Sequence, residues 1–399
     1  MDGLEVEVHL LPCASHSLLR SCSKTTLLSS ITAPIFCEIS QNTHAPPHNR
    51  LRPLPANLSW FRRAILPEIC FDARSPRFPV SGSNPSRPPF VPFYFQIFDP
   101  DMDSVGIVAK LSECIASRGG NINSVDVFVP ENKQIFYSRS EFIFDPEKWP
   151  RSVVDDDFQR LSKMFNAERS VVRVPELDPK YKIVVLTSKQ EHCLVDLLHG
   201  WQEGRLPVDI NCVISNHERA PNTHIRRFLE RHEIPYHFLP TAPSNKREEE
   251  ILELVSGTDF LVLARYMQPD ISPQPRGLNS SALLESSTTV LSGEFLETYG
   301  KDVINIHHGL LPSFKGGNPS KQAFDYGVKL IGATSHFVTE ELDAGPIIEQ
   351  MVERVSHRDN LRSFVQKSEN LEKQCLEKAI KSYCELRVLR YEEVKTVVF

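Results

Sequence analysis

The chain has 399 residues, of which 40% are hydrophobic and 24% charged, so disorder throughout is excluded and two domains are expected. Forty-five basic and 51 acidic residues leave a formal net charge of −6, which argues against a nucleic-acid partner. The sequence lacks a run of 18 apolar residues, so we expect no membrane span. The 9 cysteines are scattered without zinc-ligand spacing, and we expect reduced thiols and no metal site.

Residues 1–95 differ in composition from everything after them. Fourteen of the 30 prolines lie in the first 100 residues, serine is abundant, and basic residues outnumber acidic ones. Ser/Arg-rich, acid-poor leaders are typical of organelle transit regions, although three acidic residues among the first seven weaken an import signal. We therefore expect a disordered leader that is either a transit region or a plain disordered tail.

Residues 97–174 show a βαββ pattern that continues into a further helix and strand. The Gly119-Gly120 pair ends the first helix, because glycine readily adopts the left-handed backbone that closes a helix. A linker at 175–180 follows. The expected elements are helices at 105–117 and 155–165 and strands at 122–129, 135–144 and 170–174.

From residue 181 onward, apolar strands alternate with amphipathic helices. This alternation predicts an α/β domain whose parallel sheet is covered on both faces, with its site beyond the carboxyl ends of the strands. The expected strands are 182–187, 208–215, 236–239 and 260–264, and the expected helices are 193–202, 222–232, 247–255 and a closing helix at 360–386.

Residues 303–319 carry the strongest functional signal. A short apolar strand delivers Asn305, His307 and His308 and then breaks into a Gly/Pro loop. Because side chains alternate along a strand, Asn305 and His307 share one face, and His308 lies on the other.

A second polar group follows about thirty residues later in the sequence. Thr334 and His336 stand two apart on another apolar strand, and Asp343 lies in a loop closed by glycine and proline. His336 is equally compatible with a buried structural histidine, and an Asp near a glycine is common in ordinary turns.

Two strings in this part of the chain resemble the formyltransferase superfamily that handles 10-formyltetrahydrofolate. They are INIHHGLLPSF at 304–314 and GATSHFVTEELDAGPII at 332–348. The superfamily's Asn-x-His pair and distant Asp are matched by Asn305, His307 and Asp343. The resemblance implies a formyltransferase-like, Rossmann-type α/β catalytic domain with a mostly parallel sheet over residues 181–399.

Other residues resemble the formyltetrahydrofolate deformylase branch. His308 stands where the wider superfamily usually has proline. The string SNHERAPNTH at 215–224 also resembles the deformylase branch. The preceding module at 97–174 resembles an ACT domain, a ferredoxin-like βαββαβ fold, whose Asp-x-x-Gly entry is matched by Asp103 and Gly106. This two-domain arrangement is that of the deformylases, and the plant-type members point to a mitochondrial location.

The resemblance implies hydrolysis of 10-formyltetrahydrofolate to formate and tetrahydrofolate, which controls one-carbon folate pools and the formate supply for purine synthesis. Asn305 would donate to the tetrahedral oxyanion, and His307 would be a protonated partner or general acid. Asp343 would orient His307 and accept a proton from water. No cofactor is expected beyond the folate substrate. The expected folate-binding residues are Met267, Gln268, Val290, Leu291, Thr334 and His336.

The ACT resemblance also implies a homo-oligomer, because ACT modules pair side by side, and an amino-acid effector at the interface. The same residues could equally be ordinary helix punctuation. The expected effector contacts are Asp103, Gly106, Gly119 and Asn121.

Two alternatives belong to other functional classes. One is an amine formyltransferase of the phosphoribosylglycinamide type, which holds a phosphate on a Gly-rich turn after the first strand of the domain. Here that turn, at residues 187–193, contains no glycine, so the backbone cannot wrap closely around a phosphate. The other is a catalytically impaired ACT amino-acid sensor.

Residues 269–289 interrupt the family pattern. The resemblance implies that Met267-Gln268 runs directly into Val290-Leu291, but 21 residues with three prolines and five serines separate them. A structureless loop this long inside a compact domain is improbable. We interpret the segment as an insertion, either retained non-coding sequence or a mis-spliced gene model, with a genuine lid as the alternative.

Deletion of residues 269–289 is predicted to raise the rate of formate release strongly while changing the melting temperature little. Lengthening a short loop to some 25 residues costs only about 1–2 kcal/mol of closure entropy. A displacement of about 1 Å in a positioning residue, in contrast, can lower a rate a hundredfold. A shortened chain that is less active than the full chain would identify the segment as a working lid.

Overall fold

The computed structural model describes residues 90–98, 106–131, 135–242, 245–268 and 290–399, with backbone alone for the first of these ranges. Asp103, the leader up to residue 89 and residues 269–289 lie outside the described residues. Among the helices that are described, none is long and apolar enough to cross a membrane.

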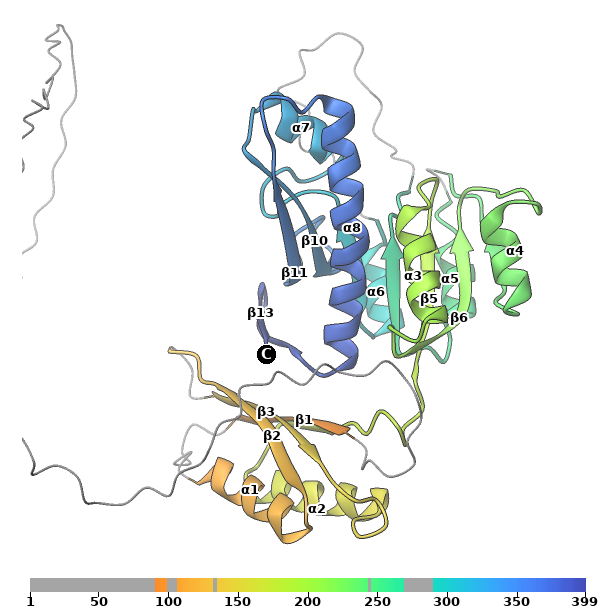
Figure 1. Cartoon of the computed structure of the whole chain (residues 1–399). Helices are drawn as coiled ribbons and strands as arrows, with labels where there is room; N and C mark the ends of the chain where they lie inside the picture. The colour runs from red at the N-terminus through yellow and green to blue at the C-terminus, as the bar shows by residue number, and fades with distance from the viewer. Residues whose placement is uncertain (1–89, 99–105, 132–134, 243–244, 269–289) are drawn as a thin grey trace, which may run out of the picture. The chain divides into compact units, whose positions relative to one another are not determined.

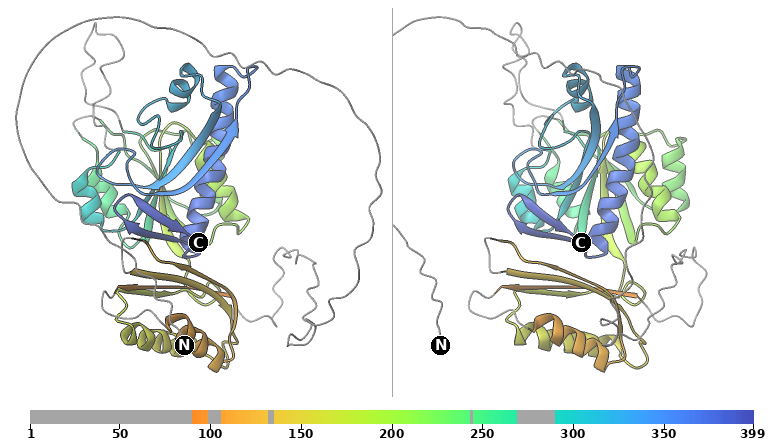
Figure 2. Two further views of the ribbon diagram at one scale, coloured as in Figure 1. Left: turned by 90° about the vertical axis from the view of Figure 1, so that its left-hand side faces the viewer. Right: turned by 60° about the vertical axis from the view of Figure 1, so that its left-hand side comes forward.

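The first module has the element order βαββαβ. Its four strands form one antiparallel sheet in the order β2-β3-β1-β4. Both helices lie on the same face of this sheet (Figure 2), where Ile107, Leu111 and Ile115 pack against Phe142 and Phe158. The elements are β1 (Phe90–Phe98), α1 (Ile107–Ser117), β2 (Asn121–Phe128), β3 (Ile135–Ile143), α2 (Arg151–Met164) and β4 (Arg169–Val172).

The first strand starts earlier than composition predicted. β1 begins at Phe90, within the range 1–95 that was expected to be a disordered leader. The prolines of that segment obscured the strand pattern, since proline removes a ladder hydrogen bond. Pro92 pairs with Glu141 of β3, whereas β4 pairs only with Phe93 to Gln96, so the proline is flanked by a partner strand on one side.

The second module contains a seven-stranded sheet in the order β11-β10-β9-β8-β5-β6-β7. The five strands from β9 to β7 are parallel, and β10 and β11 are added antiparallel at one side. The expected mostly parallel sheet is therefore confirmed. The strands are β5 (Tyr181–Thr187), β6 (Val208–Ser215), β7 (Tyr236–Phe238), β8 (Phe260–Ala264), β9 (Val303–His307), β10 (Leu330–Phe337) and β11 (Ile347–Arg354).

Helices cover both faces of this sheet (Figure 1). On one face α3, α4 and α8 bury residues such as Leu197 and Leu376 against Ile304 and Ile306 of β9. On the other face α5 and α6 pack with Val303. The remaining elements are α3 (His192–Gln202), α4 (His224–Arg231), α5 (Glu248–Leu254), α6 (Gly293–Tyr299), α7 (Pro319–Asp325), α8 (Leu361–Cys384), β12 (Val388–Glu392) and β13 (Lys395–Val398).

The strongest periodic patterns predicted their elements well, and short elements were missed. β6 and β8 have the expected bounds, and α3 begins one residue early. α2 begins at Arg151, four residues before the expected helix, because Pro150 serves as its N-terminal boundary. The short helices α6 and α7 and the β12–β13 hairpin carry too few periodic residues for a sequence pattern to show them.

Candidate active site

Pairing between β9 and β10 brings together polar residues that are about thirty positions apart in the sequence. In this antiparallel ladder His336 lies opposite Asn305, and Thr334 lies opposite His307. Ile304 and Ile306 pack on the α3/α8 face of the sheet, so strand alternation places Asn305 and His307 on the opposite face. The predicted shared face of Asn305 and His307 follows directly from this alternation.

His307 is only 4% exposed and contacts an acceptor through each ring nitrogen. Its Nδ1 lies 3.3 Å from Oδ2 of Asp343, and its Nε2 lies 3.0 Å from the carbonyl oxygen of Phe314. A carboxylate and a carbonyl can only accept hydrogen bonds. The doubly protonated, positively charged ring therefore satisfies both contacts.

Asp343 reaches His307 from the loop between β10 and β11. Its backbone has φ of 52°, in the left-handed region that Asp adopts more readily than most residues. A Cβ atom at Gly345 would collide with the carbonyl group of Phe337, so glycine is what allows the loop to approach β10 this closely. The close approach brings the carboxylate within reach of the imidazole.

The environment of Asp343 favours its ionised form. Burial alone raises the pKa of this carboxyl, but the contact with His307 and the hydrogen bond from the Gly316 N–H, at 2.9 Å, outweigh burial. The pKa is consequently lowered below its usual value. A carboxylate held this way is negative at neutral pH and faces a ring nitrogen.

His336 is buried and fixes the orientation of Asn305. Burial lowers the pKa of His336 to about 4, so the ring is neutral at physiological pH. Its Nδ1 lies 2.8 Å from the carbonyl oxygen of Phe337, to which it can only donate, so Nε2 carries the lone pair. Asn305 Nδ2, 3.2 Å away, donates to that lone pair. The second hydrogen of the Asn305 amide nitrogen is not used in this bond.

Thr334 supports the loop beneath the site. Its hydroxyl donates to the carbonyl of Gly309 at 2.8 Å and accepts from the Leu311 N–H at 3.1 Å. The amide of Gln350 donates to the same hydroxyl at 3.1 Å. With no exposed surface and these bonds formed, Thr334 holds the loop after β9.

The expected folate-wall residues differ widely in exposure. Met267 is 51% exposed, and Gln268 and Val290 are half-buried. Leu291 is 1% exposed and packs in the core beside α5 and α6. Only the first three therefore present surface from which a ligand could be contacted directly.

The expected effector residues of the first module are not brought together within one chain. Gly106 precedes α1 in a left-handed conformation, whereas Gly119 and Asn121 follow its other end. An 11-residue helix separates the two groups by about 16 Å. Asp103 lies outside the described residues.

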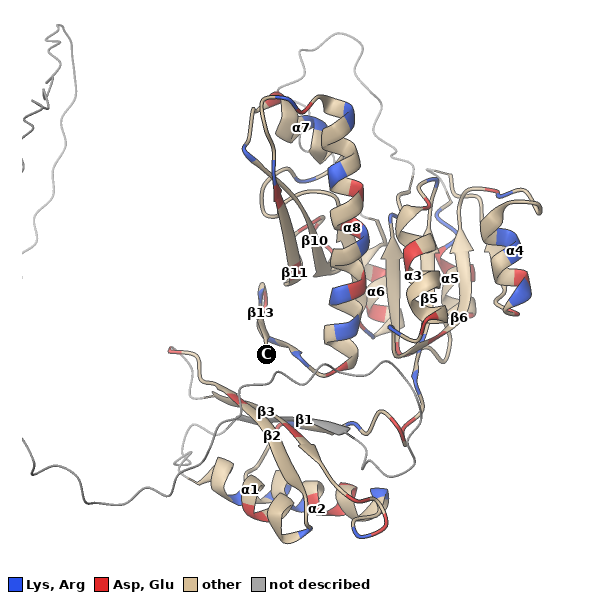
Figure 3. Cartoon of the chain, in the orientation of Figure 1, with Lys and Arg blue, Asp and Glu red and all other residues tan. Residues whose placement is uncertain are grey.

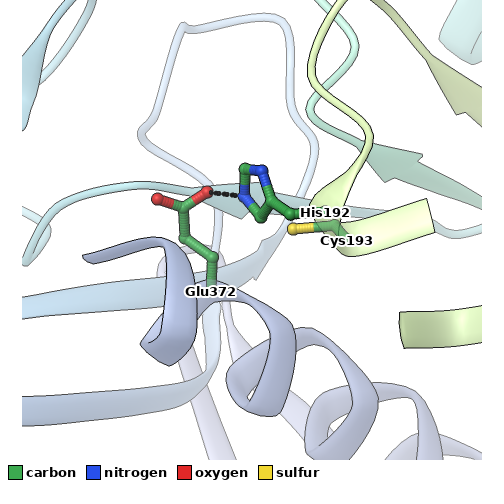
Figure 4. Close-up of side chains that lie close together, drawn as sticks. All are labelled: His192, Cys193 and Glu372. Carbon is green, nitrogen blue, oxygen red and sulfur yellow. Dashed lines mark hydrogen bonds and ion pairs between the residues drawn. The ribbon is translucent and has the colours of Figure 1, made fainter. Parts of the chain in front are cut away.

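A second buried polar cluster was missed by the sequence analysis, apart from His308. It joins Arg265 after β8, His308 after β9, His192 at the start of α3 and Glu372 of α8. His192 Nε2 lies 2.7 Å from Glu372 Oε2 (Figure 4), and Arg265 Nε lies 3.4 Å from the same oxygen. Contacts between residues so far apart in the chain leave no local signal in the sequence.

This cluster includes a set of potential metal ligands. The ligand atoms of His192, Cys193 and Glu372 lie within 4.8 Å of one another (Figure 4). Burial raises the pKa of the Cys193 thiol well above its usual value, which opposes the thiolate that a metal requires. The Arg265 guanidinium already supplies the positive charge beside Glu372. The donor set therefore fits an ion-pair network better than a metal site.

The comparisons with known proteins agree with this architecture. A family model described as formyl transferase matches residues 282–380. The Arabidopsis thaliana protein named formyltetrahydrofolate deformylase 2, mitochondrial, is 70% identical to this chain over 78% of this chain and 88% of its own length. The Arabidopsis thaliana protein named formyltetrahydrofolate deformylase 1, mitochondrial, is 71% identical over 74% of this chain and 85% of its own length. The crystal structure of a Pseudomonas syringae formyltetrahydrofolate deformylase covers 78% of this chain and 94% of its own, with 37% identity and a TM-score of 0.64. The chain belongs to the formyltetrahydrofolate deformylase family.

Proposed function

We propose that this chain hydrolyses 10-formyltetrahydrofolate, and the observation that carries the proposal is the joined set of Asn305, His307 and Asp343. Water oxygen attacks the formyl carbon to give a tetrahedral intermediate. The bond from that carbon to the folate nitrogen then breaks, the nitrogen takes up a proton, and formate leaves. The reaction needs donors for an oxyanion and a route for one proton, and it needs no resident cofactor.

The geometry supports a distinct role for each of the three residues. Asn305 donates one amide hydrogen to His336 and has the other for the developing oxyanion. His307, in the charged form that its two acceptors favour, stabilises the negative intermediate and serves as an acid toward the folate nitrogen. Asp343 orients the ring, places a negative charge beside it and accepts a proton from the attacking water.

In physiological terms, the activity regulates one-carbon folate pools and supplies formate for purine synthesis. The two named Arabidopsis relatives are mitochondrial proteins, and we assign this chain to mitochondria as well. Residues 1–89 then serve as the transit region, 90–174 as an ACT domain that includes β1, and 181–399 as the catalytic domain. The folate is held by residues around Met267, Gln268 and Val290.

The first module fits a role as an ACT regulatory domain. Its βαββαβ order and antiparallel sheet are those of a ferredoxin-like fold. The edge strand β2 exposes Val125 and Val127, and Val129 follows it, also exposed. Edge strands of this kind pair readily with a second chain. Such pairing would give a homo-oligomer and could bring Gly106 of one chain near Gly119 and Asn121 of the other around an amino-acid effector.

The purified chain is predicted to release formate and tetrahydrofolate from 10-formyltetrahydrofolate when no acceptor is added. Water is the only other reactant that the proposed site requires. Following both products in parallel by enzymatic formate detection and folate absorbance tests this directly. Formate that appears only after an amine is supplied would identify a formyltransferase instead.

Asp343→Asn is predicted to lower the rate of formate release by at least about a hundredfold, a typical loss for acid–base groups. Asn retains the size of Asp and tolerates the left-handed backbone, so the fold should persist. His307→Ala should lose as much, and the double variant little more, because the residues act as one unit.

The matched control for these variants is Asp325→Asn, which neutralises an exposed carboxylate paired with Lys321 on α7. It should retain full activity. Formate release near the wild-type rate from either Asp343→Asn or His307→Ala would remove the assignment of these residues.

Stability is predicted to fall between pH 7 and pH 5 in a way that depends on His336. An unfolded histidine titrates near pH 6.5, whereas the pKa of the buried His336 is about 4, so in this window only the unfolded chain binds the proton. The contribution of His336 to the free energy of unfolding is complete above pH 6.5 and declines as the pH falls. Between pH 7 and pH 5 the decline is about 2 kcal/mol. Urea unfolding at both pH values should show a correspondingly smaller loss in His336→Gln. Equal losses in both proteins would contradict the assignment of a neutral, buried ring.

A further inference from the structure

Glu372 is an unusual residue on α8. Charges of both signs are distributed along this helix (Figure 3), and those on its outer side reach solvent. Glu372, in contrast, is 1% exposed and shares the buried face with Cys375, Leu376 and Ala379. Its carboxylate contacts His192 at 2.7 Å, Arg265 at 3.4 Å and Ser368 Oγ at 3.1 Å.

Stability alone does not account for this buried charge. Burying a carboxylate and a guanidinium removes their hydration, and well-packed apolar residues often replace such a pair without loss of stability. The Nε atom of Arg265 is also buried without a hydrogen-bond partner of good geometry, although it lies near Glu372. The network therefore carries a desolvation cost that apolar residues at the same positions would not.

The network lies on the opposite face of the sheet edge from Asn305. His308 follows His307 and points to the α3/α8 face, where Arg265 donates to its Nδ1. The folate-wall segment instead leads into α6, on the α5/α6 face. The ring centres of His307 and His308 are 5.5 Å apart. The network therefore borders His307 from the α3/α8 face, whereas Val290 and Leu291 of the expected folate wall lead into α6 on the other face.

The network is largely buried: the side chains of His192 and Arg265 are 12% exposed and that of Glu372 is 1% exposed. Ser188 Oγ accepts from the Met267 N–H at 2.9 Å and donates to the Met267 carbonyl at 3.0 Å, which joins the loop after β5 to the loop after β8. Arg219, itself 7% exposed, donates to the Ser188 carbonyl at 2.7 Å. These bonds fix the backbone of both loops at the carboxyl ends of β5 and β8.

We propose that the Glu372–Arg265–His192–His308 network determines the acceptor specificity of the site by excluding compact amines from the α3/α8 side of His307, so that water alone takes the formyl group. The inference rests on the proposed function and adds to it the residues that separate hydrolysis from transfer. Excluding a competitor by filling its space is a common route to specificity.

The reaction that the network is proposed to prevent is transfer of the formyl group to an amine. An amine nitrogen would attack the same formyl carbon, the bond to the folate nitrogen would break, and the amine proton would pass to that nitrogen. The products would be a formamide and tetrahydrofolate. Hydrolysis and transfer share the oxyanion that Asn305 faces, so the choice between them depends on which nucleophile reaches the carbon.

The test measures how the formyl group is partitioned between water and glycinamide, a compact primary amine. The full-length chain is supplied with 10-formyltetrahydrofolate and saturating glycinamide, and formate and N-formylglycinamide are quantified together. His192→Ala removes a ring of about the size of glycinamide without leaving a buried charge unpaired, because Glu372 retains Arg265. Glu372→Gln keeps the volume and removes the charge.

The matched control is Glu377→Gln, which neutralises the neighbouring α8 carboxylate that pairs with Arg205 at the surface. The wild type and this control should give formate almost alone. His192→Ala should raise the ratio of N-formylglycinamide to formate by at least about tenfold, a typical effect of reshaping a specificity pocket. Circular dichroism verifies that each variant is folded, and His192→Ala provides the test if Glu372→Gln is not.

The possible failures are distinct. Absence of formate both from the wild type and from the chain that lacks residues 269–289 would remove the proposed function together with this inference. Formate from the wild type accompanied by an unchanged product ratio in His192→Ala would overturn the inference alone. A wild type that already formylates glycinamide readily would overturn it as well, because the network would then exclude nothing.

Discussion

The alternation of side chains along β9 is the constraint on which the site depends. Ile304 and Ile306 are buried beneath α3 and α8, so Asn305 and His307 must lie on the opposite face. A shift of one residue would place the apolar pair in the site and the polar pair in the core. Burial of two isoleucines thus positions the two polar groups, and pairing with β10 then adds His336 opposite Asn305.

The buried charged groups of the site are stabilised because they have partners. His307 and Asp343 are both nearly buried, and each would be unfavourable there without the other. Gly345 permits the approach that pairs them, and the Gly316 N–H and the Phe314 carbonyl satisfy the remaining groups. A hydrogen-bonded polar network in a low dielectric is rigid, and rigid donors are what oxyanion stabilisation requires.

Local periodicity made β9, β6 and β8 predictable, and the alternation rule by itself was enough to assign His307 and His308 to different faces of the sheet. Other features depend on contacts that no local pattern carries. Arg265 and Glu372 meet only because α8 packs on the face of the sheet beside β9 and β10. The bonds of Thr334 depend on the loop after β9, and the prolines around β1 masked a strand that pairing with β3 stabilises.

The two faces of the sheet at the end of β9 can meet two different requirements, stabilisation of the intermediate and choice of the nucleophile. The tetrahedral intermediate is nearly the same whether water or an amine attacks, so residues that stabilise it cannot distinguish the two nucleophiles. Water reaches any site that is not sealed, and a more nucleophilic amine must therefore be kept away by shape. An ion pair is well suited to this, because opening it would expose a carboxylate and a guanidinium to incomplete hydration. An apolar filling of the same volume could move aside at lower cost. In the specificity role proposed above, a buried charge at position 372 of α8 serves better than another leucine would.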